Sequence, residues 1–122
     1  MDYSKYLDEI IELSSTQKEQ LYSYFNLLVE SSKVMNLTTI TEEEDVYIKH
    51  FYDSLLLSKT VDLTKTLTLA DIGSGAGFPG LVIKIMFPSV HITLIEPTLK
   101  RCNFLNLVIN ELGLKDIEVV NA

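Results

Sequence analysis

Four of the chain's five glycines lie within eight residues of one another, in the segment LADIGSGAGFPG (residues 69–80). Gly73, Gly75 and Gly77 follow an apolar run and precede a segment of helical character. Glycines where a strand turns into a helix allow positive φ angles and a close approach of the backbone to a ligand. The start of the helix adds free N–H groups and partial positive charge. The segment therefore predicts a seat for part of a nucleotide.

Two acidic residues suggest which nucleotide this seat would take. Glu96 ends the next predicted strand, 23 residues after Gly73, where a carboxylate can accept hydrogen bonds from ribose hydroxyls. Asp71 lies two residues before Gly73, where it would repel a pyrophosphate. The dinucleotide pattern G-x-G-x-x-G also requires a third glycine where this chain has Phe78. The pattern favours S-adenosylmethionine, which carries a sulfonium and an ammonium group. The place of Phe78 in a strand-to-helix loop favours contact with the adenosine or methionine part of this cofactor, and the alternative is a core position.

The residues alone leave three classes of function open. The first is an S-adenosylmethionine-dependent enzyme. The second is a nicotinamide-dependent oxidoreductase, or a fragment of one, which Phe78 and Asp71 disfavour. The third is a non-enzymatic interaction module whose helical N-terminal part binds a partner.

Composition and charge exclude some classes of protein. The chain has 122 residues, 47% of them apolar, which is enough for one domain with a real core. It has no 18-residue apolar run and a single cysteine, so we expect a cytoplasmic protein with no membrane segment. The net charge of −7 argues against broad, nonspecific nucleic-acid binding. Residues 1–70 carry 12 acidic and 6 basic side chains, whereas residues 71–122 carry 5 and 4, so a polyanion site would be local and would lie in the second half.

Periodicity predicts an α/β protein with two units, at residues 1–60 and 61–122. The first unit is helical: a helix at residues 3–13, a second after a Thr16–Glu19 capping box, and a third after a Thr41–Glu44 capping box, with a break near Asp53. The second unit alternates strands and helices, which implies a Rossmann-like parallel sheet of about three strands. Its predicted strands are residues 67–72, 91–96 and 117–121, and its predicted helices are residues 79–87 and 99–112, the latter ended by Gly113.

A third group of side chains could also do chemistry. Lys49, His50 and Asp53 are close in sequence on the third predicted helix and could face RNA or an active site. The alternative is an ion pair between Lys49 and Asp53 on a solvated helix. His50, His91 and Cys102 are too scattered to predict a metal site.

The chain resembles the small-subunit ribosomal RNA guanine-N7 methyltransferases, also called the glucose-inhibited division protein B family. The similarity extends over almost the whole chain and is most specific in four stretches: NLTTIT (36–41), YIKHFYDSL (47–55), DIGSGAGFPG (71–80) and KRCNFL (100–105). The glycine segment alone would indicate only a methyltransferase of this general fold. Its combination with KHFYDSL is much more specific.

The resemblance implies an S-adenosylmethionine-dependent enzyme that methylates N7 of one guanine in small-subunit rRNA. It implies that Gly73 and Phe78 line the cofactor site and that Glu96 takes the place of the ribose-binding acid. Lys100 and Arg101 match a basic pair that faces rRNA in the family, and the alternative is that they form the solvated first turn of a helix. Guanine N7 is already a nucleophile, so no catalytic triad is expected, and His50 and Asp53 are candidates for the active site.

The resemblance also implies that the chain is truncated. The family's sheet has seven strands, and the predicted strands here number about three. We therefore expect the first half of the methyltransferase sheet, with one edge of its first strand uncovered and open to self-association.

Overall fold

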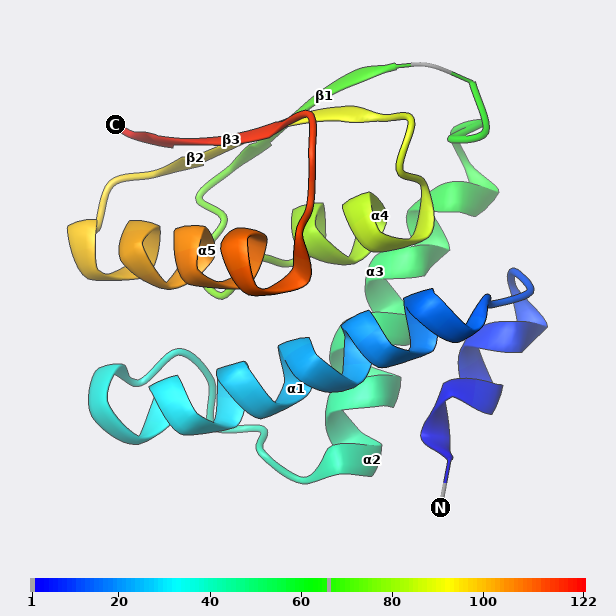
Figure 1. Ribbon diagram of the computed structural model, residues 1–122, viewed down its shortest axis with the longest axis horizontal. Helices are drawn as coiled ribbons and strands as arrows, with labels where there is room; N and C mark the ends of the chain where they lie inside the picture. Colours follow the sequence, from blue (N-terminus) through cyan, green and yellow to red (C-terminus); the bar gives the residue numbers. More distant parts are fainter. Residues whose placement is uncertain (1, 66) are drawn as a thin grey trace.

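The computed structural model describes residues 2–65 and 67–122. Three strands, β1 (Thr68–Ile72), β2 (His91–Glu96) and β3 (Ile117–Asn121), form a parallel sheet in the order β1-β2-β3. Two helices, α4 (Gly80–Met86) and α5 (Leu99–Leu112), connect the strands and cover one face of the sheet (Figure 1). The predicted parallel α/β arrangement is confirmed.

The N-terminal part is helical, as predicted, but its helices differ in type and bounds. It comprises the 3₁₀-helix η1 (Tyr3–Glu9) and the long helix α1 (Ser15–Met35). A second helical run then passes through four short pieces with no break at Asp53: α2 (Glu43–Asp45), the π-helix η2 (Val46–Tyr52), α3 (Asp53–Leu55) and the 3₁₀-helix η3 (Leu56–Lys59). The predicted break near Asp53 is therefore wrong.

Both predicted capping boxes are also wrong. Helix α1 begins after Ser14, whose hydroxyl accepts from the Gln17 amide while the Gln17 side chain accepts from the Ser14 amide. At the start of α2, the N-cap residue is Glu42, with no side-chain cap. Glu44 instead accepts a hydrogen bond from the Tyr6 hydroxyl at 3.0 Å, so a tertiary contact uses the carboxylate that the predicted box needed.

One apolar core joins the two predicted units. Helix α1 packs against α4 and α5 on the side away from the sheet (Figure 1). Its buried residues Leu21, Tyr24 and Leu28 belong to the same core as those of the sheet and of η2. The helical part therefore forms a third layer. It positions α3 beside α4 and places His50 of η2 against Phe78, just before α4.

The opposite face of the sheet carries no helix in the described part of the chain (Figure 1). Ile72, Ile95 and Val120 are aligned across the three strands there, and Ile72 is 81% exposed. Within the described residues β1 pairs only with β2, which leaves its outer edge without a strand partner. Self-association through this edge stays a prediction, and the mass of the chain in solution tests it. No helix among the described residues is long and apolar enough to cross a membrane.

Candidate functional site

The glycine turn after β1 has the backbone conformation that the sequence predicts. Gly73, Gly75 and Gly77 have φ angles of +74°, +55° and +99°. The Gly73 and Ser74 amides donate to the Ile95 carbonyl, at 2.7 and 3.3 Å, which fixes the turn to the neighbouring strand β2. Gly77 is also needed for space, because a Cβ atom there would lie 2.7 Å from the Tyr24 hydroxyl and would overlap Leu81.

Glu96 lies at the carboxyl end of β2 and closes the glycine turn. Its side chain accepts from the Gly75 amide at 2.8 Å and from the Thr98 amide at 2.8 Å, one on each carboxylate oxygen. The residue is only 2% exposed. Burial alone would raise the pKa of Glu96, but the hydrogen bonds from Thr98 and Gly75, together with the charge of Arg101, outweigh it and hold the pKa below its ordinary value. Glu96 is thus a charged group tied to both loops that follow β1 and β2.

Asp71 belongs to β1, and its side chain reaches the first residue of α4. Its carboxylate accepts from the Gly80 amide at 3.1 Å and is almost fully buried. Burial raises the pKa of Asp71, and the Gly80 hydrogen bond partly opposes that rise. The amide of Leu81 donates to the Gly77 carbonyl. The expectation of free N–H groups at the start of this helix is therefore wrong for Gly80 and Leu81, because Asp71 and Gly77 accept their hydrogen bonds.

Phe78, directly after the turn, connects it to the N-terminal helices. Its ring stacks on the His50 ring with centroids 4.3 Å apart and planes 8° apart, and it also stacks on Tyr24 at 5.5 Å. The His50 Nε2 atom lies 3.0 Å from the Thr38 hydroxyl. The NLTTIT connector and the KHFYDSL stretch thus meet the glycine segment at one place in the fold.

Tyr24 and Thr38 are site residues that sequence reasoning missed. The Tyr24 hydroxyl donates to the Ala76 carbonyl inside the glycine turn. In sequence, Tyr24 is one of several apolar residues on the buried stripe of a helix, and nothing in its spacing separates it from its neighbours. Thr38 lies in a connector whose partner, His50, becomes apparent only in the fold.

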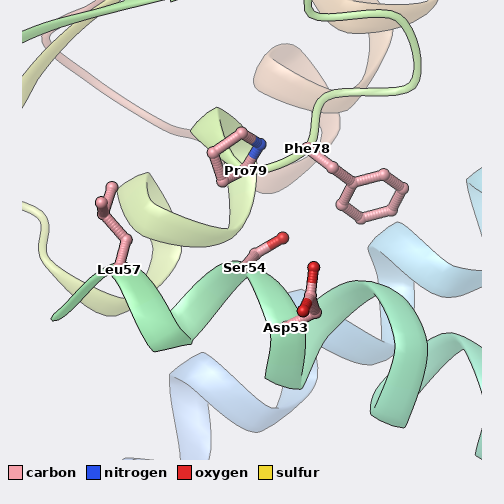
Figure 2. Close-up of a pocket in the computed structure, with 5 residues that line it drawn as sticks. All are labelled: Asp53, Ser54, Leu57, Phe78 and Pro79. Carbon is pink, nitrogen blue, oxygen red and sulfur yellow. The ribbon is translucent and has the colours of Figure 1, made fainter. Parts of the chain in front are cut away.

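A cavity of about 240 Å³ lies between α3 and the start of α4 (Figure 2). Its apolar wall consists of Leu57, Phe78 and Pro79. Asp53 and Ser54 supply its polar side, and both point from the helical run toward the Phe78–Pro79 segment (Figure 2). The cavity adjoins the exit of the glycine turn because Phe78 directly follows Gly77.

The basic residues singled out in the sequence lie on two different elements, Lys49 on η2 and the adjacent pair Lys100 and Arg101 on α5. Lys49 pairs with Asp45 at 3.9 Å, so the alternative reading of an ion pair with Asp53 is wrong. Lys100 and Arg101 are in the first turn of α5. Arg101 contributes to the low pKa of Glu96, so it is electrostatically coupled to the glycine turn.

The scattered histidines and the cysteine stay separate in the fold. His91 is exposed near Glu118, whereas Cys102 is buried and donates to the Glu96 carbonyl. Across residues 2–65 and 67–122, no three side chains of the metal-binding types gather into one site.

His50 gives the fold a predicted pH dependence. Burial lowers the pKa of His50 from its ordinary 6.5, with the charge of Asp53 opposing. The associated stability is fully present above pH 6.5 and is lost as the pH falls through the lowered pKa, because the folded state resists protonation. We expect the free energy of unfolding to fall between roughly pH 7.5 and 5, and to fall less in His50→Gln. Urea titrations at both pH values measure this, with His91→Gln as the matched control. The same fall in both variants would contradict the assignment.

Comparison with known proteins identifies the family. The family model described as GidB, rRNA small subunit methyltransferase G, matches residues 17–122. A curated relative from Staphylococcus epidermidis, named ribosomal RNA small subunit methyltransferase G, is 50% identical over 117 residues, which cover 96% of this chain and 49% of the relative. Relatives of the same name from Staphylococcus aureus and Staphylococcus saprophyticus are 47% and 48% identical, and each alignment covers 91% of this chain and 46% of the relative. The chain therefore spans about half the length of these relatives. It belongs to the rRNA small subunit methyltransferase G (GidB) family.

Proposed function

We propose that the chain is the cofactor-binding part of an S-adenosylmethionine-dependent methyltransferase that modifies N7 of a guanine in small-subunit rRNA. The relatives' names support methyl transfer to small-subunit rRNA. The observation that carries the cofactor part is Glu96, whose carboxylate is fixed to the Gly75 and Thr98 amides at the carboxyl ends of adjacent parallel strands. This is the edge of a parallel sheet where nucleotides bind.

The residues present fit this cofactor better than a dinucleotide. No heavy atom lies within 4 Å of the position that a Cβ would take on Gly73, so the backbone there is open to a ligand. Glu96 accepts one backbone amide on each oxygen, and a carboxylate has about four acceptor positions in all, so it can also accept from ribose hydroxyls. The Gly75 amide already donates to Glu96, and the Gly80 amide already donates to Asp71. A pyrophosphate would therefore lie close to two carboxylates and would find fewer free N–H donors. The nicotinamide alternative is therefore not favoured, and the methyltransferase family membership disfavours an interaction module as well.

Methyl transfer to guanine N7 requires mainly that the cofactor and the base are aligned. The bound cofactor would supply a methyl group on a sulfonium, and guanine N7 carries an in-plane lone pair that needs no deprotonation. The chain's own contribution is then to bind and orient the two partners. His50 suits a positioning role because its ring is held between Phe78 and Thr38.

The proposal also assigns an RNA-facing role to three basic residues. Lys49, Lys100 and Arg101 are on η2 and α5, at or near the surface of a chain that is otherwise acidic. Adjacent basic side chains such as Lys100 and Arg101 can contact phosphate oxygens, and Lys49 would exchange its Asp45 partner for a phosphate. Action on rRNA would place the protein in the cytoplasm.

Calorimetric titration tests the cofactor assignment. We expect the 122-residue chain to bind S-adenosylmethionine and not NAD, and we expect only S-adenosylmethionine to raise the melting temperature, since a ligand that binds the native state stabilises it. A folded sample that binds NAD instead, or neither compound, would contradict the proposal for this chain.

A further inference from the structure

The cavity between α3 and the start of α4 presents hydrogen-bond acceptors on one side only. The Ser54 hydroxyl donates its proton to the His50 carbonyl at 2.6 Å, so toward the cavity it can only accept. The Asp53 carboxylate is also an acceptor. The remaining lining, Leu57, Phe78 and Pro79, is apolar. A ligand that fits must therefore be flat or apolar on its faces and carry donors on one edge.

Asp53 is available for such a ligand. Its side chain is exposed at the mouth of the cavity, and no hydrogen bond or ion pair to it is found among the described residues. Lys49, one helical turn earlier, pairs with Asp45 and leaves Asp53 uncompensated. Figure 2 shows the Asp53 carboxylate and the Ser54 hydroxyl side by side, both directed at the Phe78–Pro79 segment.

Among the four RNA bases, guanine matches this pattern of acceptors. Its N1–H and exocyclic N2–H groups are adjacent donors, and a carboxylate can accept from both at once. Adenine and cytosine offer one amino group beside a ring acceptor, and uracil offers one N–H between two carbonyls. The cavity of about 240 Å³ is smaller than the roughly 300–1,000 Å³ of pockets for drug-sized ligands, which suits a single base.

We propose that this cavity receives the target guanine of the RNA, with the Asp53 carboxylate accepting hydrogen bonds from guanine N1–H and N2–H. The inference rests on the proposed function, and it adds the recognition of the base. The N1 and N2 donors and N7 are on opposite edges of the purine. Binding through the first edge therefore leaves N7 directed away from Asp53 and free to accept the methyl group. Ser54 adds an acceptor beside the carboxylate, and Leu57, Phe78 and Pro79 exclude water from the faces of the ring.

Nuclear magnetic resonance on the isotope-labelled 122-residue chain tests this assignment. The probes are guanosine, inosine and adenosine monophosphates, and the signals followed are the backbone amides of Ser54, Leu57 and Phe78. We expect guanosine monophosphate to shift these amides. Inosine monophosphate, which lacks the N2 amino group, should bind about tenfold more weakly, the loss that corresponds to about 1.4 kcal/mol. Adenosine monophosphate should leave the three amides in place.

The variants Asp53→Asn and Asp116→Asn complete the test. Asp53→Asn should weaken guanosine monophosphate binding about tenfold with an unchanged melting temperature. Asp116→Asn makes the same chemical change in an exposed residue just before β3, and should leave binding intact. Equal binding of the three nucleotides, unchanged binding by Asp53→Asn, or shifts confined to Gly73–Gly77 would overturn the inference. If S-adenosylmethionine binds in calorimetry while guanosine monophosphate fails, only the base pocket is wrong; the reverse result would overturn the cofactor assignment alone.

Discussion

Gly77→Ala is expected to lower the free energy of unfolding by about 2–4 kcal/mol. Two effects add. The backbone at Gly77 has a φ angle of +99°, a conformation that strains any residue with a Cβ atom. The new methyl group would also lie 2.7 Å from the Tyr24 hydroxyl and overlap the Leu81 side chain. Both neighbours are fully buried, so neither can move away without a cost to the core.

Gly113→Ala is the matched control for this substitution. Gly113 ends α5 with a φ angle of +66°, and no heavy atom lies within 4 Å of the position of its Cβ. It should therefore cost only the backbone strain, about 1–2 kcal/mol. Urea denaturation of the two variants measures the difference. Equal losses would mean that the close approach to Tyr24 and Leu81 does not constrain the turn.

The second half of the fold could be predicted from the sequence because its signals are local. The bounds of β2, α5 and β3 agree with the predicted ranges 91–96, 99–112 and 117–121. In each of these segments the apolar residues recur with a single period, that of a strand or that of a helix. Gly113 ends α5 in the left-handed conformation. The positive φ angles of the glycine turn follow from the same kind of local rule.

The capping boxes show a choice that local sequence rules cannot predict. Ser14–Gln17 and Thr16–Glu19 both satisfy the pattern, and nothing local chooses between them. In the fold, the Gln17 side chain also donates from Nε2 to the carbonyls of Ile85 and Met86, at 3.2 and 3.3 Å. That contact with the end of α4 favours the earlier box, and it joins residues 68 and 69 positions apart in the chain.

The candidate site also combines features that the sequence predicts with features that depend on the fold. The residue types of Asp71, Phe78 and Glu96 pointed to a nucleotide seat, but their contacts depend on the assembled layers. The stacking of Phe78 on His50 and the bond of Tyr24 to Ala76 both link the helical part to the glycine turn. A cavity formed between α3 and α4 leaves no periodic signal in either segment, so the sequence could nominate Asp53 without indicating what it faces.

Glu96→Ala is expected to destabilise the fold by about 3 kcal/mol at neutral pH. The substitution leaves the Gly75 and Thr98 amides without their acceptor, and both bonds are to a charged group inside the protein. Glu96→Gln keeps one acceptor oxygen and should cost less. If the carboxylate also binds the ribose of S-adenosylmethionine, both variants should lose affinity for the cofactor, and Gln should retain more of it. Glu118→Gln, on the exposed side of β3, is the matched control.

The pH dependence of these variants distinguishes the stabilising effect of the Glu96 charge from that of its size and hydrogen-bonding geometry. Because the pKa of Glu96 is held below its ordinary 4.5, its stabilising contribution is present above that value and is lost as the pH falls through the lowered pKa. Urea titrations at roughly pH 7 and 4 should therefore show a smaller acid loss in Glu96→Gln than in Glu118→Gln. An equal acid loss would mean that the charge of Glu96 does not hold the turn closed. Loss of cofactor binding in Glu96→Gln with unchanged stability would leave Glu96 as a ligand-binding group alone, and the glycine turn would then owe its shape to the Ile95 and Tyr24 hydrogen bonds.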